Sequence, residues 1–174
     1  IPSLHHENDG LIFTPVNEPY IIGTCQLLLK WKPAHLNTVD FKLFVKWDTQ
    51  QRPYFLLFDA YCSGLRFYDY LTPKSDEENK TFLNMNGCIV ECSFDSDWIT
   101  RYNSEEPGAS PNAEKPGGWR YHRTRTDKDS PNDHSVVQKI IESIGNSVSQ
   151  EELISFIPKI RQNFKSRQVH QPIS

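Results

Sequence analysis

Alternating apolar and polar residues predict a series of short strands in the middle of the chain. Between residues 39 and 47, apolar side chains occupy every second position, and Phe44 is the exception among the positions between them. A period of two is typical of a half-buried strand. Four further segments have strand composition and are separated by polar or Pro- and Gly-bearing loops: residues 54–59, 65–71, 87–94 and 119–125. Five short strands predict a small barrel of the OB type, although a five-stranded open sheet would give the same pattern.

Two shorter strand patterns precede this region. Residues 11–14 follow an Asp-Gly turn signal and stop at Pro15, and residues 26–31 end before Pro33. In the second of these, the period of two places Lys30 and Lys32 on one face and Trp31 on the other. The sequence therefore predicts a strand with two cations on one side.

After Pro131 the apolar period becomes that of a helix. One helical pattern covers residues 136–144 and ends at Gly145-Asn146, and a second covers residues 153–164. Ser149 with Glu152 forms a capping-box signature for the second helix, and Pro158 should kink that helix or split it in two. The charged segment 72–80 and the Pro- and Gly-bearing segment 107–117 are expected to be exposed loops. The predicted fold class is mainly β with α-helices at the C-terminal end.

Composition excludes several classes of protein. With 174 residues, 37% of them hydrophobic, and a formal net charge of -3, the chain can bury a core and is not disordered as a whole. No window approaches the roughly 18 consecutive apolar residues of a membrane-spanning helix, so we expect no membrane. Four cysteines are too few for a disulfide scaffold, and Cys88 and Cys92 are interpreted as buried thiols because a zinc site would need two more ligands. The first residue is not Met, which favours a piece of a longer or processed protein.

Three polar clusters carry the candidate chemistry. Lys30 and Lys32 could grip a phosphate from one side, or could be two solvated lysines. Asp9 could bind a divalent cation through carboxylate oxygen, or could belong to an ordinary Asp-Gly turn. The third cluster contains two guanidinium groups, an ammonium group, a carboxylate and an amide, and consists of Arg123, Arg125, Asp127, Lys128 and Asn132.

The third cluster suits a pyrophosphate or triphosphate, because guanidinium groups bind phosphate oxygens in pairs. In a continuous strand Arg123, Arg125 and Asp127 would fall on one face. The alternative for this cluster is a cross-strand ladder of ion pairs.

The order of these clusters resembles motifs IV, V and VI of the covalent nucleotidyltransferases. More narrowly it resembles the mRNA capping enzymes, or GTP:RNA guanylyltransferases, of the fungal type. The resemblance rests on Asp-Gly-Leu-Ile-Phe-Thr-Pro at residues 9–15, on Leu-Lys-Trp-Lys-Pro at 29–33 followed by Asn-Thr-Val-Asp-Phe at 37–41, and on Arg-x-Asp-Lys at 125–128. ATP-dependent DNA ligases share the last motif but usually have Glu-Gly in the first.

The resemblance implies a domain plan and a reaction. It implies terminal strands of a nucleotidyltransferase domain at residues 1–37, an OB-fold domain at 38–131 and closing helices at 132–174. In this family, a lysine attacks the α-phosphate of GTP, pyrophosphate leaves, and GMP then passes from the lysyl-GMP intermediate to the 5′-diphosphate end of nascent RNA.

The same resemblance assigns roles to the candidate residues. Lys30 and Lys32 match the pair that contacts the α-phosphate, and Asp9 matches the carboxylate near Mg²⁺ or Mn²⁺. Arg125, Asp127 and Lys128 match the motif that orients the β- and γ-phosphates, with Arg123 and Asn132 as weaker members. Asp40 matches an acidic position of the family to which the sequence gives no role.

One departure from the family pattern is plain. The nucleophilic lysine of the family lies in a Lys-x-Asp-Gly motif, and this sequence contains no such tetrad, because its single Asp-Gly is preceded by Asn8. Motifs III and IIIa are missing as well. We therefore expect the chain to be the C-terminal part of the enzyme and to form no covalent adduct alone.

The resemblance also implies partners and a location. These are GTP, 5′-diphosphate RNA, an RNA 5′-triphosphatase, the phosphorylated C-terminal repeats of RNA polymerase II or an elongation-factor tail, and the nucleus. Two alternatives to an enzymatic role stay open: an OB module that binds single-stranded RNA, and a docking platform for a phosphorylated tail of the transcription machinery.

Overall fold

The computed structural model describes residues 8–16, 18–23, 25–102 and 113–169. The chain divides into two compact units, one formed by Ile1–Ala34 together with Asn146–Ser174 and the other by His35–Gly145. We call the first the hairpin unit and the second the barrel unit, and we describe each separately. The chain passes between them near a short 3-10 helix, η1 (Ala34–Leu36), and again after residue 145.

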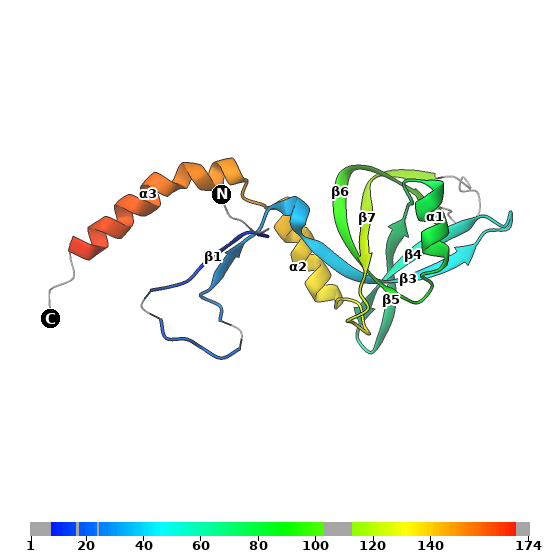
Figure 1. The fold of residues 1–174 in the computed structure, drawn as a ribbon, viewed down its shortest axis with the longest axis horizontal. Coiled ribbons are helices and arrows are strands. Elements are labelled where there is room, and N and C mark those ends of the chain that lie inside the picture. The colour runs from blue at the N-terminus through cyan, green and yellow to red at the C-terminus, as the bar shows by residue number, and fades with distance from the viewer. Residues whose placement is uncertain (1–7, 17, 24, 103–112, 170–174) are drawn as a thin grey trace. The chain divides into compact units, whose positions relative to one another are not determined.

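The barrel unit is a closed five-stranded barrel (Figure 1). Its strands are β3 (Thr38–Trp47), β4 (Pro53–Tyr61), β5 (Gly64–Leu71), β6 (Ile89–Tyr102) and β7 (Ala113–Thr124). They pair in the order β3-β4-β5-β7-β6, and β6 returns to β3. The β5–β7 pair is parallel and the other pairs are antiparallel. The OB-like barrel predicted from the five strands is confirmed, and the open sheet is excluded.

Two parts of the barrel unit differ from the sequence prediction. Helix α1 (Asp76–Leu83) occupies most of the segment predicted to be a loop. It forms because the Ser75 hydroxyl accepts a hydrogen bond from the Glu78 amide at 3.2 Å, and because Phe82 is fully buried in the barrel core. In addition, β6 and β7 are longer than predicted, and β7 runs through Pro116 and Gly117 where a loop was expected.

The barrel core is built from inward-facing residues of every strand. Val39, Phe41 and Leu43 of β3 are buried at alternate positions. The ring of Phe41 packs edge-on against the buried Trp119, with 4.7 Å between ring centroids. A fully buried side chain of this size contributes about 2 kcal/mol through removal from water. The residues that alternate with them on β3 therefore face outward, and these include Asp40, Lys42 and Phe44.

Helix α2 (His134–Gly145) confirms the first predicted helix and packs on the barrel through the buried Val137. The first residue of α2, His134, contacts the buried carboxylate of Asp59. Asp59 has no exposed surface, and its Oδ2 accepts a hydrogen bond from Arg66 at 3.0 Å and lies 2.7 Å from Nδ1 of His134. This contact holds the start of α2 against β4.

The hairpin unit contains a two-stranded sheet and the last helix. Strand β1 (Leu11–Phe13) pairs antiparallel with β2 (Leu29–Trp31), which is shorter than the predicted strand 26–31. Helix α3 (Gln150–Val169) begins as predicted, because the Ser149 hydroxyl accepts from the Glu152 amide at 3.0 Å. It continues through Pro158, so of the two predicted outcomes, a kink or a split in two, the split is excluded. Apolar residues of α3 and of both strands line a groove, among them Phe13, Trp31 and Ile157.

No helix in the described part of the chain is both long enough and apolar enough to span a membrane.

Candidate functional site

The polar cluster of the hairpin unit consists of Asp9, Lys30 and Lys32, and it depends on the close packing of Gly10 against the backbone of Trp31. Gly10 has a backbone φ of +150°, and a Cβ atom at this position would lie 2.0 Å from the carbonyl oxygen of Trp31. Only glycine allows the two backbones to approach this closely. The approach brings Asp9, two residues before β1, beside the two lysines that flank Trp31.

Asp9 contacts both of those lysines. Its Oδ2 accepts a hydrogen bond from Lys30 Nζ at 3.1 Å and lies 3.7 Å from Lys32 Nζ. The hydrogen bond from Lys30, together with its positive charge, lowers the pKa of Asp9. The two lysines therefore share one face of the strand, as the period of two predicted. Among the described residues no cluster of three or more His, Cys, Asp or Glu side chains is present, so Asp9 offers a single carboxylate to a cation.

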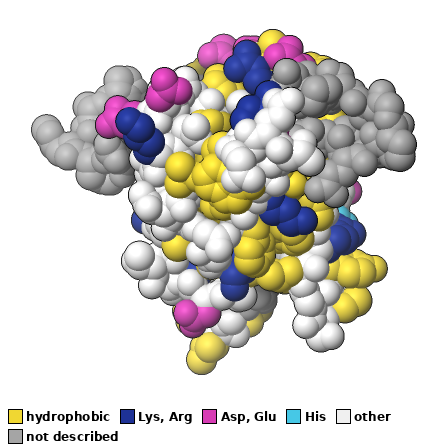
Figure 2. All heavy atoms as spheres, turned by 90° about the vertical axis from the view of Figure 1, so that its right-hand side faces the viewer, with side chains coloured by type: hydrophobic (Ala, Val, Ile, Leu, Met, Phe, Trp, Pro, Cys, Tyr) yellow, Lys and Arg dark blue, Asp and Glu magenta, His cyan; other side chains and the backbone are white. Residues whose placement is uncertain are grey.

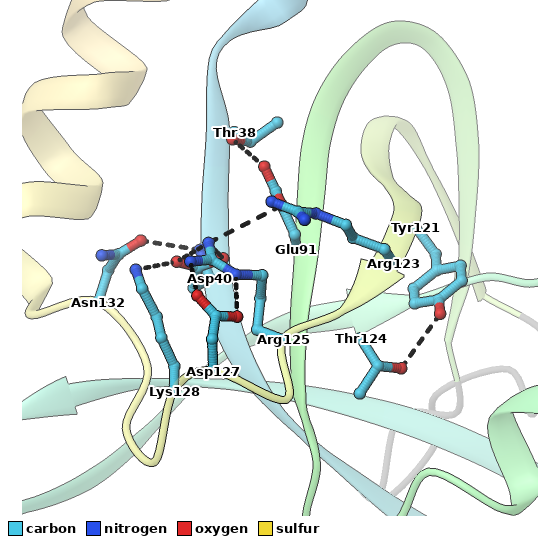
Figure 3. Close-up of polar contacts among 10 residues, drawn as sticks. All are labelled: Thr38, Asp40, Glu91, Tyr121, Arg123, Thr124, Arg125, Asp127, Lys128 and Asn132. Atoms are coloured by element: carbon cyan, nitrogen blue, oxygen red, sulfur yellow. Dashed lines mark hydrogen bonds and ion pairs between the residues drawn. The ribbon is translucent and has the colours of Figure 1, made fainter.

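The larger cluster lies in the barrel unit, just beyond the end of β7. This strand ends at Thr124, so Arg125, Asp127 and Lys128 belong to the turn that follows it and not to a continuous strand face. The turn is anchored to β6 because the Arg125 amide donates to the Ile89 carbonyl at 2.8 Å. The prediction that Arg125 and Asp127 share a strand face with Arg123 is therefore wrong, but the turn still gathers the side chains of Arg125, Asp127 and Lys128 (Figure 3).

Arg125 bridges two carboxylates. Its Nε and Nη2 atoms donate to the two oxygens of Asp127 at 2.8 and 2.7 Å, and its Nη1 donates to both oxygens of Asp40 at 3.1 and 3.0 Å. Hydrogen bonding to Asp127 raises the pKa of Arg125 further, and the same contact lowers the pKa of Asp127. Lys128 Nζ also donates to Asp40. A buried carboxylate thus holds both cations of the turn.

Asn132 braces Asp40 through the backbone. Its side-chain oxygen accepts from the Asp40 amide at 2.8 Å, and its own amide donates to the Asp40 carbonyl at 2.8 Å. Its carbonyl accepts from the Ala60 amide at 2.9 Å. Asn132 therefore bridges β3 and β4 and fixes the backbone of Asp40.

Arg123 belongs to a neighbouring ion pair across two strands. It lies directly opposite Glu91 in the β6–β7 register, and its Nε donates to Glu91 Oε2 at 2.6 Å. The hydroxyl of Thr38 donates to the other oxygen of Glu91 at 2.8 Å. The cross-strand alternative therefore describes Arg123, while Arg125 and Lys128 form the cluster around Asp40.

Glu91 is a member of the site that the sequence did not identify. Burial raises its pKa, but hydrogen bonds from Arg123 and Thr38 outweigh this effect and lower the pKa overall. One of its oxygens also lies 3.8 Å from Nη1 of Arg125. No motif marks Glu91, and it joins the site only through the pairing of β6 with β3 and β7.

The arrangement is suited to binding phosphate. Each of the three cations, Arg123, Arg125 and Lys128, has a carboxylate partner. A phosphate that binds here would therefore take the place of one of these carboxylates, whose oxygens are spaced much like its own. The most accessible of these is Asp127, with a side chain 63% exposed, whereas the side chain of Asp40 is only 7% exposed. A guanidinium fork that leaves Asp127 can accept two phosphate oxygens in the same way.

Comparison with known proteins gives a consistent family assignment. Residues 36–154 match the C-terminal domain of mRNA capping enzymes, and residues 1–34 match the catalytic domain of mRNA capping enzymes. The alpha subunit of the mRNA-capping enzyme of Schizosaccharomyces pombe is 34% identical over 181 residues, which cover 96% of this chain and 40% of that protein. The corresponding subunit of Saccharomyces cerevisiae is 33% identical over 202 residues, which cover 98% of this chain and 43% of that protein.

The likeness extends beyond fungi. The mRNA-capping enzyme of Caenorhabditis elegans is 30% identical over 153 residues, which cover 87% of this chain and 22% of that protein. The chain thus spans less than half the length of the curated relatives that it matches. Because the C-terminal domain match alone covers residues 36–154, the chain belongs to the mRNA capping enzyme family.

Proposed function

We propose that this chain is the C-terminal part of an mRNA guanylyltransferase. The whole enzyme would transfer GMP from GTP, through a lysyl-GMP intermediate, to the 5′-diphosphate end of nascent RNA. The observation that carries this proposal is the placement of Arg125 and Lys128 on one buried carboxylate, Asp40, within the domain that matches capping enzymes. Such a pair of cations suits a pyrophosphate group.

Arg125 and Lys128 would orient the β- and γ-phosphates of GTP. Pyrophosphate can leave only if it lies in line with the nucleophile that attacks the α-phosphate, so positioning of the leaving group contributes to the rate. Asp127 would release the guanidinium fork when the triphosphate binds, while Asp40 keeps the turn in place. Arg123, paired with Glu91, would add positive charge at the edge of the site.

Lys30 and Lys32 would contact the α-phosphate, where negative charge develops during transfer. Asp9 fits a contribution to Mg²⁺ or Mn²⁺ binding, because such ions are commonly held by one or two carboxylates together with substrate phosphates. When bound, the ion would neutralise phosphate charge during the transfer. Lys30 and Lys32 both contact Asp9, so the three side chains lie on the same face of the hairpin.

The nucleophile would come from a Lys-x-Asp-Gly segment, which this sequence does not contain. The chain alone should therefore form no covalent adduct with GTP. Incubation with labelled GTP and Mn²⁺, followed by a denaturing gel, measures this directly. A labelled band at 20.2 kDa would contradict the proposed division of labour.

Reconstitution tests the activity itself. The chain is mixed with a fragment of the family's catalytic domain that holds the Lys-x-Asp-Gly segment, and both steps are assayed. Lys128→Ala should abolish adduct formation with GTP and leave GMP transfer from a preformed adduct intact. Lys139→Ala, which removes an exposed lysine of α2, is the matched control. Equal loss of both steps in Lys128→Ala would count against the β- and γ-phosphate role.

The proposal extends to partners and location. The fungal relatives are named as alpha subunits, which suits an assembly with a second subunit, and we propose an RNA 5′-triphosphatase for that role. We further propose a nuclear location and docking to the phosphorylated repeats of RNA polymerase II or to an elongation-factor tail. Co-purification of the tagged chain with a triphosphatase from nuclear extract would test the first partner. Binding of the chain to the polymerase or elongation-factor tail should be lost when the tail is treated with phosphatase, which tests the second.

A further inference from the structure

A row of aromatic side chains crosses the outside of the barrel. It runs from Phe44 on β3 to Phe58 on β4, and then to Phe67 and Tyr70 on β5 and Tyr102 at the end of β6. Successive ring centroids are 5.1, 5.9, 5.0 and 5.4 Å apart. None of the five belongs to the buried core, and Phe67 is 43% exposed. Four of these rings give the outer side of β3–β5 a continuous aromatic surface.

Two lysines accompany this row. Lys42 and Lys46 flank Phe44 at alternate positions of β3 and so share its face. Among the described residues, neither ammonium group has an ion-pair partner. We call Lys42, Phe44, Lys46, Phe58 and Phe67 the aromatic face. Figure 2, which views one end of the barrel unit, shows hydrophobic side chains exposed beside Lys and Arg side chains.

The acidic groups near this face are neutralised. Asp69 on β5 is buried and bonded to Lys115 at 2.5 Å, and Asp48 at the end of β3 is bonded to Arg52 at 2.7 Å. Asp59 is buried with Arg66 and His134. The uncompensated charge on the aromatic face therefore comes from Lys42 and Lys46, and the face favours an anionic ligand with planar groups.

Strand β3 connects this face with the phosphate cluster. Asp40, which holds Arg125 and Lys128, lies two residues before Lys42 and four before Phe44 on the same outward side. At a rise of roughly 3.3 Å per residue, the span from Asp40 to Phe44 is about 13 Å. An RNA strand whose 5′ end approaches the Asp40 end of β3 could therefore place its next few bases on the aromatic rings.

We infer that the aromatic face binds the first nucleotides of the acceptor RNA, with the 5′ end of the RNA directed toward the Asp40 end of β3; this inference rests on the proposed function. Base stacking on aromatic rings tolerates any sequence, as a capping substrate of variable sequence requires. Lysines between the rings suit phosphodiester groups. A phosphorylated peptide has no comparable use for a row of five rings, so RNA is the favoured ligand.

Binding to the 174-residue chain provides the first test. A fluorescent, unstructured 5′-diphosphate oligoribonucleotide is titrated by anisotropy at several salt concentrations. Phe67→Leu, which keeps an apolar side chain but removes the ring, should weaken binding about tenfold. Lys42→Gln combined with Lys46→Gln should reduce the slope of log affinity against log salt by about 1.4, corresponding to roughly 0.7 for each phosphate contact in a single strand.

The controls are an exposed lysine and an exposed aromatic residue that do not belong to this face. Lys139→Gln on α2 and Tyr20→Ala in the hairpin unit should bind RNA as the unchanged chain does. Thermal unfolding establishes that Phe67→Leu is folded. Unchanged RNA affinity in Phe67→Leu and in the double lysine variant would overturn the inference. If the same variants, with unchanged RNA affinity, lost affinity for a phosphorylated serine-proline peptide, the ligand of this face would be such a peptide and not RNA.

The reconstituted enzyme separates this inference from the proposed function. Phe67→Leu should leave adduct formation with GTP unchanged and slow GMP transfer about tenfold when the RNA is below saturation. If Lys128→Ala loses the adduct while Phe67→Leu transfers GMP at the normal rate, the inference fails and the proposed function stands. If no adduct forms in any reconstituted sample, the proposed function fails, and the RNA titration alone decides whether the face binds RNA.

Discussion

The Nη1 atom of Arg125 donates hydrogen bonds to both carboxylate oxygens of Asp40, at 3.1 and 3.0 Å. Eighty-five positions of sequence separate the two residues, so the contact ties the turn after β7 to the first strand of the barrel. Because the backbone of Asp40 also exchanges two hydrogen bonds with Asn132, the guanidinium group has a fixed partner on one side. Its other partner, Asp127, is exposed and therefore exchangeable.

Asp40→Asn should greatly slow adduct formation but leave the protein folded. The variant keeps the shape of the side chain and the backbone contacts with Asn132, but it removes the charge that holds Arg125 and Lys128. We expect adduct formation with GTP to fall about 100-fold in the reconstituted enzyme, as for other losses of positioning. The rate of adduct formation and the thermal midpoint of unfolding are measured on the same variant, so that loss of activity is distinguished from loss of folding. A variant with normal adduct formation would show that Asp40 does not position the two cations.

Arg125→Lys should be a severe change despite the conserved charge. Lysine has one ammonium group and cannot bridge Asp127 and Asp40 as the planar guanidinium group does. Adduct formation should therefore fall about 100-fold, which is the usual effect of losing a positioned donor. Arg167→Lys, near the end of α3, is the matched control and should have no effect. Full activity in Arg125→Lys would mean that charge alone is required at this position.

The contact between Arg125 and Asp127 should give stability a defined pH dependence. The pKa of Asp127 lies below its ordinary value of 3.8 because Arg125 donates to it. Since the folded protein favours the charged carboxylate, this stabilisation is complete above the unfolded pKa and is lost as the pH falls through the folded value. Asp127→Asn should therefore lower the thermal midpoint at neutral pH, with a difference that shrinks below about pH 4. Thermal unfolding across pH measures it, and a difference that grows on acidification would contradict it.

Asp59→Asn should destabilise the barrel unit. The change leaves Arg66 and His134 without the buried anion that both contact, and uncompensated buried charge costs about 3 kcal/mol. We place the effect at the lower end of the range because the side chain of Arg66 is 39% exposed and can turn to solvent. Urea unfolding measures the loss. Glu142→Gln, on an exposed position of α2, is the control, and an equal small effect in both variants would refute the role of Asp59.

Ser149→Ala should loosen the start of α3. The hydroxyl caps the Glu152 amide at 3.0 Å, and loss of such a cap costs about 1 kcal/mol. Ser149→Asp retains an acceptor and should behave like the unchanged chain. Amide hydrogen exchange in the first turn of α3 reports the difference. Equal protection in the alanine and aspartate variants would mean that the cap does not stabilise this helix.

The strands were predictable wherever one face alone is buried. The alternation in β3 is directly visible, and Lys30 and Lys32 share a face as expected. Helix α1 was not predicted because Phe82 is its single buried residue, so the helical period is absent from its sequence. The extension of β7 was missed for a different reason. Pro116 and Gly117 suggested a loop, but they lie in the strand together with Gly118, where a Cβ would be 2.1 Å from the hydroxyl of Thr100.

The polar site was predictable in its residues but not in their connections. The motifs identified Arg125, Asp127 and Lys128, whereas the sequence gave Asp40 no role. The structure supplies that role as the shared anion of the two cations. Glu91 could not be found, because its membership depends on the register of β6 against β3 and β7, which no local pattern specifies.

Strand β3 has a consequence for how the site can change over evolution. Its inward residues, such as Phe41, build the core, and its outward residues, Asp40 and Phe44 among them, belong to the proposed binding surface. A single inserted or deleted residue would turn every outward side chain inward and every core side chain toward water. Substitution can alter one side of the strand independently of the other, but changes in chain length cannot. We therefore expect length variation among capping enzymes to avoid this strand and to fall in the loops.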